Sequence, residues 1–202
     1  IAIAAKAINP NIRIIGVQAK LYPSMYNAIK GTDLPNRGDT LAEGIAVKSP
    51  GHITREIIRR LVDDIVLVSD DDIERAVAML ISVEKTVAEG AGAAGLAAVL
   101  AAPERFKGTN VGLVLTGGNI DTRLLANVLL RDLARSGRIA RLRIRLQDRP
   151  GALFKVMKIF DDKQVNIIEI YHQRIFTTLP AKGLITDIEC EARDKEHLDS
   201  LV

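Results

Sequence analysis

The residues best suited to chemistry form a turn, Thr116-Gly117-Gly118-Asn119, directly after the apolar run Val111–Leu115. We expect that run to be a strand and Leu124–Leu133 to be a helix. In open α/β sheets, ligands bind beyond the carboxyl ends of strands. Gly117 and Gly118 carry no side chain, so a flat ligand can approach the backbone closely. An ordinary strand-to-helix turn explains the spacing equally well.

A second segment, Glu89-Gly90-Ala91-Gly92-Ala93-Ala94-Gly95, carries almost no side-chain bulk at an expected helix start. Such a start accepts a ligand or another backbone at close range. Glu89 is the only ionisable residue of the segment. A tight helix–helix contact that needs Gly and Ala is at least as good an explanation of this composition.

These segments need a scaffold, and the surrounding pattern alternates strands with helices. We expect strands at 12–17, 64–68 and 111–115, and helices at 1–8, 24–30, 53–61, 70–81, 90–102 and 124–133. This order predicts an α/β domain with a mostly parallel sheet. Residues 31–51 form a long loop, a feature that is usually functional or mobile. Since the chain opens inside a helical pattern without Met, we expect it to be a piece of a longer protein.

The pattern changes after Ser136-Gly137. Arginines at 141, 143 and 145 alternate with apolar residues, which predicts a one-sided strand. The turn Asp148-Arg149-Pro150-Gly151, a helix with apolar residues to Phe160, strands at 166–175 and 184–191, and a helix capped by Asp194 follow. The order β-α-β-β-α predicts a ferredoxin-like α+β sandwich that lacks its last strand. We therefore expect domains at 1–135 and 139–202, joined by a linker at 136–138.

Composition excludes several functional classes. The 202 residues carry a net charge of +3, with no basic run interleaved with aromatics, which argues against nucleic-acid binding. No apolar stretch is long enough to span a membrane. The lone Cys190 indicates a reducing, cytoplasmic location. His52, His172 and His197 stand apart from other ligand residues, so we expect no metal site.

Several ordered segments resemble the pyridoxal-phosphate-dependent threonine dehydratases, whose catalytic domain has fold type II. They are Thr40–Val47, Leu61–Ser69, Thr86–Ala93 and Leu115–Asp121. The resemblance implies that the Thr116 hydroxyl bonds the pyridine nitrogen of pyridoxal 5'-phosphate. It also implies that Gly117 and Gly118 pack against the ring and that Glu89 lies close to the cofactor.

The resemblance has departures. Nothing here matches the Ser-Phe-Lys-like segment that holds the cofactor covalently, or the glycine-rich phosphate cradle. We therefore assign no catalytic residue and expect the chain to be inactive by itself, as part of an enzyme that converts L-threonine to 2-oxobutanoate and ammonia. Gln18 stands where relatives often carry an acidic residue near a cation, so we expect no metal.

The second half resembles the ACT regulatory domain, through Asp148–Leu153 and Val165–Ile167. ACT domains bind amino acids and commonly pair, which implies a homo-oligomer and makes Asp148, Gly151 and Asn166 candidate effector contacts. Gly151 leaves N–H groups open at a helix start, which favours a carboxylate. A purely structural turn and strand start is equally consistent. The alternative function is a non-catalytic regulatory or oligomerisation fragment that binds an amino-acid effector.

Overall fold

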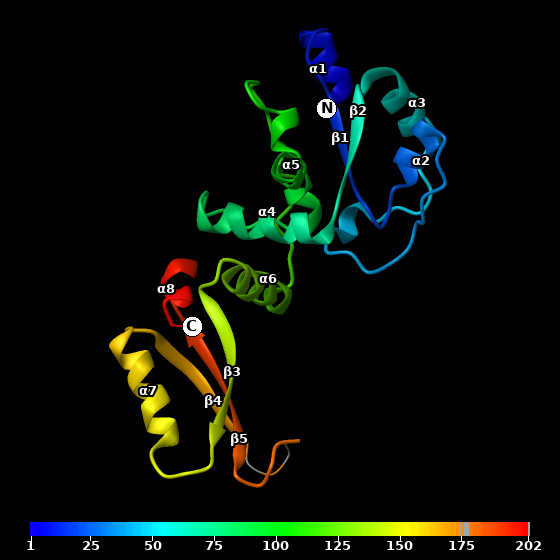
Figure 1. Cartoon of the computed structure of the whole chain (residues 1–202). Coiled ribbons are helices and arrows are strands. Elements are labelled where there is room, and N and C mark those ends of the chain that lie inside the picture. The colour runs from blue at the N-terminus through cyan, green and yellow to red at the C-terminus, as the bar shows by residue number, and fades with distance from the viewer. Residues whose placement is uncertain (174, 176–177, 202) are drawn as a thin grey trace. The chain divides into compact units, whose positions relative to one another are not determined.

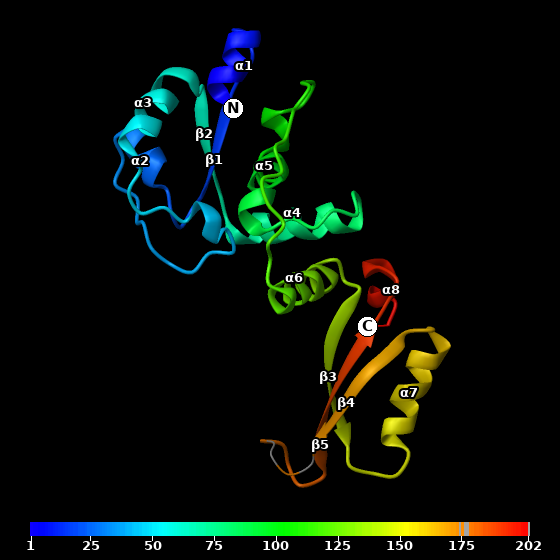
Figure 2. The ribbon, with the colours of Figure 1, turned by 180° about the vertical axis from the view of Figure 1, so that it is seen from behind.

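The computed structural model describes residues 1–173, 175 and 178–201. The chain divides into two compact units, residues 1–128 and 129–202 (Figures 1 and 2). Among the described residues, the first unit holds a parallel pair of strands and the second holds three antiparallel strands. The mixed α/β fold class that the sequence predicts is confirmed.

The first unit is built on β1 (Ile15–Ala19) and β2 (Asp64–Val68), which pair in parallel with Ile15 opposite Asp64. Parallel neighbours need a crossover connection, and residues 20–63 supply it. Helices α2 and α3 lie on one side of the strand pair and α5 lies on the other (Figures 1 and 2). The helices are α1 (Ala2–Ile8), α2 (Ser24–Lys30), α3 (His52–Leu61), α4 (Asp70–Ser82), α5 (Gly90–Ala101) and α6 (Thr122–Arg135), which continues into the second unit, with short 3₁₀ turns η1 (Glu43–Ile45) and η2 (Pro103–Arg105).

The core of this unit is aliphatic and rich in alanine. Helix α4 buries Ile73 and Val77, and α5 buries Ala93 and Ala97 with none of their surface exposed. Small residues let the two helices pack closely. Ser69 and Asp72 form a capping box at the start of α4.

Two strand predictions need correction. The strand expected from Ile12 begins at Ile15, because the Ile14 N–H donates to the Asp63 carboxylate at 2.7 Å. The strand expected at Val111–Leu115 does not form. A strand needs a hydrogen-bonded neighbour, and within the described residues this sheet contains β1 and β2 alone. Val114 is accordingly 52% exposed.

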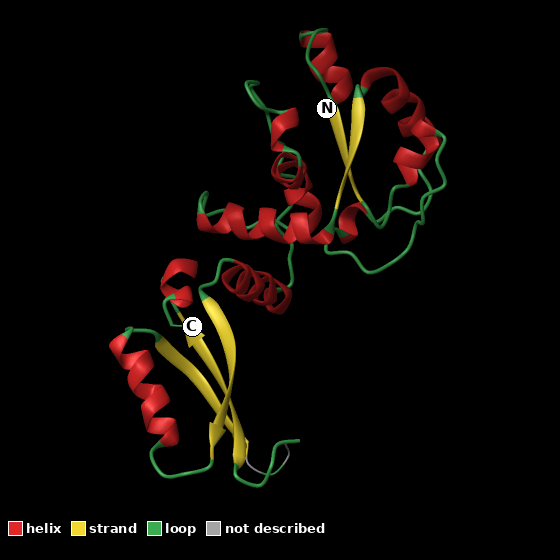
Figure 3. Cartoon of the chain, viewed as in Figure 1, coloured by secondary structure: helices red, strands yellow, loops and turns green. Residues whose placement is uncertain are grey.

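The second unit matches the predicted β-α-β-β-α order. Its sheet has the order β3-β5-β4, with both pairs antiparallel, and α7 packs against the sheet (Figure 3). The elements are β3 (Ile139–Gln147), α7 (Ala152–Asp162), β4 (Asn166–Gln173), β5 (Gly183–Glu191) and α8 (Lys195–Asp199). Arg174, inside the strand expected at 166–175, and Val202, the expected domain end, lie outside the described residues.

The core of the second unit lies between the sheet and α7. Its buried members are Val156, Phe160, Val165, Ile188 and Cys190. Val156 and Phe160 lie on one face of α7 and Ile188 and Cys190 are alternate residues of β5, as the helical and strand periods require, while Val165 directly precedes β4. The Asp194 carboxylate accepts from the His197 N–H at 2.8 Å, which confirms the predicted cap of α8.

Candidate functional site

The start of α5 is a place where backbones approach each other closely. A Cβ built on Gly90 would lie 2.3 Å from the Leu41 carbonyl oxygen. Real side chains do not tolerate such a distance, so only glycine lets the Leu41 backbone pass here. Glu89 precedes the helix as its N-cap residue. A carboxylate at this end is favoured by the helix dipole.

The Thr116-Gly117-Gly118-Asn119 turn lies directly against this helix start. The Glu89 N–H donates to the Gly117 carbonyl oxygen at 3.0 Å. A Cβ on Gly117 would lie 2.5 Å from Glu89 Oε1, and one on Gly92 would lie 2.6 Å from the Gly117 oxygen. Two segments chosen separately from the sequence therefore meet in the structure. The contact requires glycine at position 92, because a side chain there would meet the Gly117 backbone.

Gly118 and Thr116 flank that contact. A Cβ on Gly118 would meet the Val87 carbonyl oxygen at 2.9 Å. Thr116 is exposed beside Gly117. The turn thus presents one hydroxyl next to two residues that have no side chain.

A third segment reaches the same place, although no role was predicted for it. A Cβ added to Gly44, in η1, would lie 3.1 Å from the Ala91 Cβ and 3.6 Å from Glu89 Oε1. The Glu89 carboxylate is therefore near both Gly44 and Gly117. The sequence feature that could have pointed to this segment is the Glu43-Gly44 pair within Thr40–Val47. Together the three segments place glycine backbone beside a carboxylate and an exposed hydroxyl, groups that can hydrogen-bond a polar ligand.

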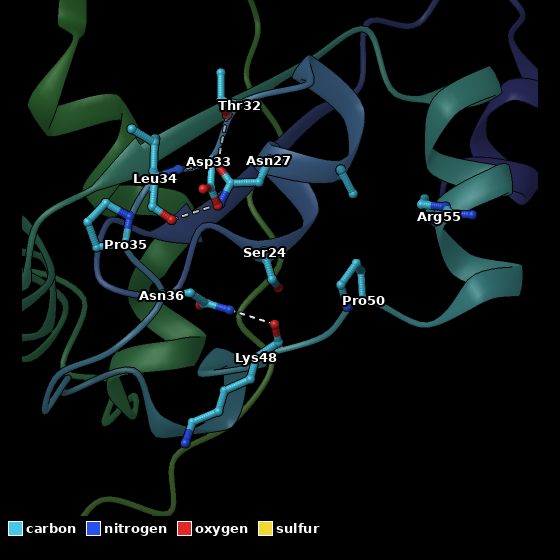
Figure 4. Close-up of a pocket in the computed structure, with 11 residues that line it drawn as sticks. Ser24, Asn27, Thr32, Asp33, Leu34, Pro35, Asn36, Lys48, Pro50 and Arg55 are labelled. Atoms are coloured by element: carbon cyan, nitrogen blue, oxygen red, sulfur yellow. Dashed lines mark hydrogen bonds between the residues drawn. The ribbon is translucent and has the colours of Figure 1, made fainter.

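Two pockets lie along the crossover of the first unit. One, of about 370 Å³, is lined by Gly44 together with residues of β1, α2 and α3. The other, of about 600 Å³, is lined by loop residues and α2 (Figure 4). In the second pocket the Asn36 amide donates to the Lys48 carbonyl oxygen at 2.5 Å, and Asn27 donates to the Leu34 oxygen at 2.9 Å. Figure 4 shows the Lys48 ammonium extended away from the pocket centre. These contacts keep the long loop ordered.

Gln18 is occupied by its own neighbours. Its Oε1 accepts from the Tyr26 N–H at 2.7 Å, and its Nε2 donates to the Tyr22 carbonyl oxygen at 3.3 Å. The amide therefore ties the end of β1 to α2. Across the part of the chain that the structure describes, no three His, Cys, Asp or Glu residues gather where they could hold a metal ion.

The candidate effector contacts of the second unit lie at two places. Gly151 caps the start of α7 in the left-handed region, at φ 80°, and Asp148 precedes it. Asn166 begins β4 after the other end of α7. Eleven helical residues separate the two places, which corresponds to about 16 Å along the axis. A small amino acid within one copy does not touch both.

Arg141 and Arg143, from the arginine row on β3, have acidic partners on β5. Arg143 binds Asp187 through two hydrogen bonds, at 2.7 and 2.8 Å, and Arg141 binds Glu189. The Arg143 guanidinium holds the pKa of Asp187 below its ordinary value. The Arg141 guanidinium also lies 5.3 Å from the centre of the Tyr171 ring. Two neighbouring ion pairs therefore connect β3 and β5 on this face of the sheet.

In the described part of the chain, no helix is both long and apolar enough to cross a bilayer.

The comparisons with known proteins find two families along the chain. Residues 1–117 match the model described as "Pyridoxal-phosphate dependent enzyme", and residues 140–201 match the model for the ACT domain. The L-threonine ammonia-lyase of Thermotoga maritima is 35% identical over 203 residues, which is 100% of this chain and 50% of that protein. The Geobacter sulfurreducens enzyme of the same name is 39% identical over 205 residues, which is 100% of this chain and 51% of that protein.

Part of the chain also aligns with a solved structure. The processed form of threonine deaminase isoform 2 from Solanum lycopersicum aligns with 64% of this chain and 36% of its own, with a TM-score of 0.55 and 32% identity. The chain spans about half the length of the curated relatives it matches.

Proposed function

The chain belongs to the pyridoxal-phosphate dependent enzyme family and carries an ACT domain, and from that premise we propose that it is part of a threonine ammonia-lyase. The reaction is the loss of water from L-threonine followed by hydrolytic release of ammonia, which leaves 2-oxobutanoate. Serine, which also carries a β-hydroxyl, is a possible second substrate class. The names of the relatives that match the whole chain support this assignment.

The observation that carries the proposal is the meeting of three segments at the start of α5. Gly44, Glu89 and Gly117 come from far apart in the sequence, yet each contacts at least one of the others. Gly117 and Gly118 add no side chain that would keep a flat ring away from the turn. Pyridoxal 5'-phosphate, when bound, supplies an electron sink for the reacting carbon of the substrate.

Within this site we propose that Thr116 hydrogen-bonds the pyridine nitrogen and that Glu89 lies beside the ring. A neutral hydroxyl does not favour protonation of that nitrogen as a carboxylate would. Such a hydroxyl would hold the ring nitrogen in place and leave it unprotonated, which suits elimination of the β-hydroxyl of the substrate.

A chimera tests the activity. This chain replaces the 203 matching residues in the Thermotoga maritima relative, and formation of 2-oxobutanoate from L-threonine is followed in the presence of pyridoxal 5'-phosphate. We expect turnover by the chimera and none by the chain alone. A chimera whose circular dichroism matches the parent enzyme, but which does not act on threonine, would contradict the proposal.

We further propose that the ACT domain binds an amino acid between two copies of the chain. Asp148 and Gly151 lie at one end of α7 and Asn166 lies at the other, so a second copy is needed to bring both sets to one ligand. Calorimetry with isoleucine, valine, serine and threonine should detect binding, and light scattering should detect a dimer or larger assembly. A folded, strictly monomeric chain that binds none of them would contradict this. It would also remove the alternative of a regulatory fragment.

We propose a cytoplasmic location. Cys190, the single cysteine, is free and buried, and burial raises the pKa of its thiol. A chain whose single cysteine forms no disulfide within it suits a reducing compartment.

A further inference from the structure

The segment that carries Gly44 has little regular structure of its own. Residues 31–51 contain only the three-residue turn η1. Gly44 nevertheless has to stay beside Glu89 and Ala91, and a loop of this length needs an anchor to hold such a position.

Asp70 is that anchor. The Thr40 hydroxyl donates to Asp70 Oδ1 at 2.7 Å, and the Leu41 N–H donates to the same oxygen at 2.7 Å. The Ala42 N–H in turn donates to the Thr40 hydroxyl oxygen at 3.2 Å. Hydrogen bonds to a carboxylate are stronger than those between neutral groups. Asp70 therefore fixes Thr40 and Leu41 directly, and Ala42 through Thr40.

Asp70 itself sits on a rigid base. It is the first residue of α4, directly after β2, whose Val68 is completely buried. The capping box fixes the backbone on either side of it. Ser69 and Asp72 exchange hydrogen bonds at 3.0 and 3.2 Å. The position of its carboxylate is thus set by the sheet and by α4.

The anchored residues lead directly to the site. The Leu41 carbonyl oxygen crosses Gly90 at the start of α5, and Ala42 is completely buried. Two residues later Gly44 lies against Ala91 and near the Glu89 carboxylate. A shift of Leu41 therefore moves Gly44 relative to Glu89 and Gly117.

We propose that Asp70 is a positioning residue, which sets the distance between the Gly44 segment and the Glu89–Gly117 contact and so how tightly the cofactor ring is held there. The inference rests on the proposed function for the identity of the ligand. The anchoring of the segment by Asp70 is tested without any ligand.

The first experiment measures amide hydrogen exchange of the full chain. Asp70→Ala should speed exchange of residues 40–46 by about tenfold or more, because two charge-assisted hydrogen bonds are lost. Asp70→Asn keeps the Oδ1 acceptor, so it should restore much of the protection. Asp71→Ala is the matched control: it removes the same charge from the same helical turn, at an exposed position. It should leave residues 40–46 unchanged.

A second pair of variants approaches the anchor from the loop. Thr40→Val removes one of the two donors while keeping the side-chain shape, and should give a smaller increase than Asp70→Ala. Thr40→Ser keeps the hydroxyl and should behave like the parent chain. Equal effects of Asp70→Ala and Asp71→Ala, or an increase in exchange that is as large in residues 73–80 of α4, would show general destabilisation and overturn the proposal.

The link to the cofactor is measured in the chimera. Asp70→Ala should raise the pyridoxal 5'-phosphate concentration for half-maximal activity several-fold, with a smaller effect on kcat, and Asp71→Ala should not. An unchanged cofactor requirement in Asp70→Ala overturns the positioning role. An inactive chimera contradicts the proposed function instead, and the exchange measurements still decide whether Asp70 anchors the loop.

Discussion

Each of the two units is stabilised internally by a different kind of contact. In the second unit, large apolar side chains from β5 and α7 fill the space between sheet and helix, with Ile188 and Phe160 at the centre. At the site of the first unit, bare backbones touch at Gly90, Gly92 and Gly117. A core of side chains is damaged by removing atoms, whereas a contact between glycines is damaged by adding them. This difference decides which substitutions each region tolerates.

The largest effect is expected from removing volume in the second unit. Ile188 is fully buried, so Ile188→Ala should cost about 2–5 kcal/mol of unfolding free energy. Hydrogen exchange in β3 and β5 measures it locally, because a chain of two units need not unfold in one step. Val114→Ala, at a position that is 52% exposed, is the control and should cost less than about 0.5 kcal/mol. Similar losses in the two variants would show that Ile188 is not a core residue.

Adding one carbon at the glycine contact should have the next largest effect. Gly90→Ala places a Cβ 2.3 Å from the Leu41 oxygen, which should cost about 1–3 kcal/mol as an overpacked contact. Gly95→Ala is the control in the same helix, because its Cβ would meet nothing closer than 3.6 Å. It should stabilise the chain by up to about 1 kcal/mol through helix propensity. Thermal unfolding compares the two, and effects of the same sign would contradict the close approach.

The smallest effects concern paired carboxylates in the two units. Lys30 and Arg105 lower the pKa of Asp64, and Arg143 lowers that of Asp187. A lowered pKa in the folded state adds stability above the ordinary pKa of the carboxyl, and this stability is lost as the pH falls through the folded value. Both units should therefore weaken in acid. Carboxyl NMR titration of Arg143→Ala should show the pKa of Asp187 rising while that of Asp64 stays low. An unmoved Asp187 would rule out the ion pair as the cause.

The sequence predicted most elements because their signals are local. The arginine alternation identified β3, and Asp194 identified the start of α8. Val111–Leu115 is as apolar as a buried strand. A strand also needs a hydrogen-bonded neighbour, however, and the local sequence does not show whether a neighbour is present. The site was predicted in part for the same reason. The glycine clusters at 90 and 117 could be selected from the sequence by their composition. Gly44 could not, because only the fold places it beside Glu89.

The proposal that Glu89, Gly117 and Thr116 form one side of a cofactor site is tested most directly by threonine turnover in the chimera. Thr116→Val removes the hydroxyl and keeps the shape, so kcat/KM should fall by about 10- to 100-fold, as expected for a lost hydrogen bond to the ligand. Thr116→Ser keeps the hydroxyl and should retain most of the activity. Equal activity of the Val and Ser variants would contradict the assignment of Thr116 and with it the proposed cofactor site.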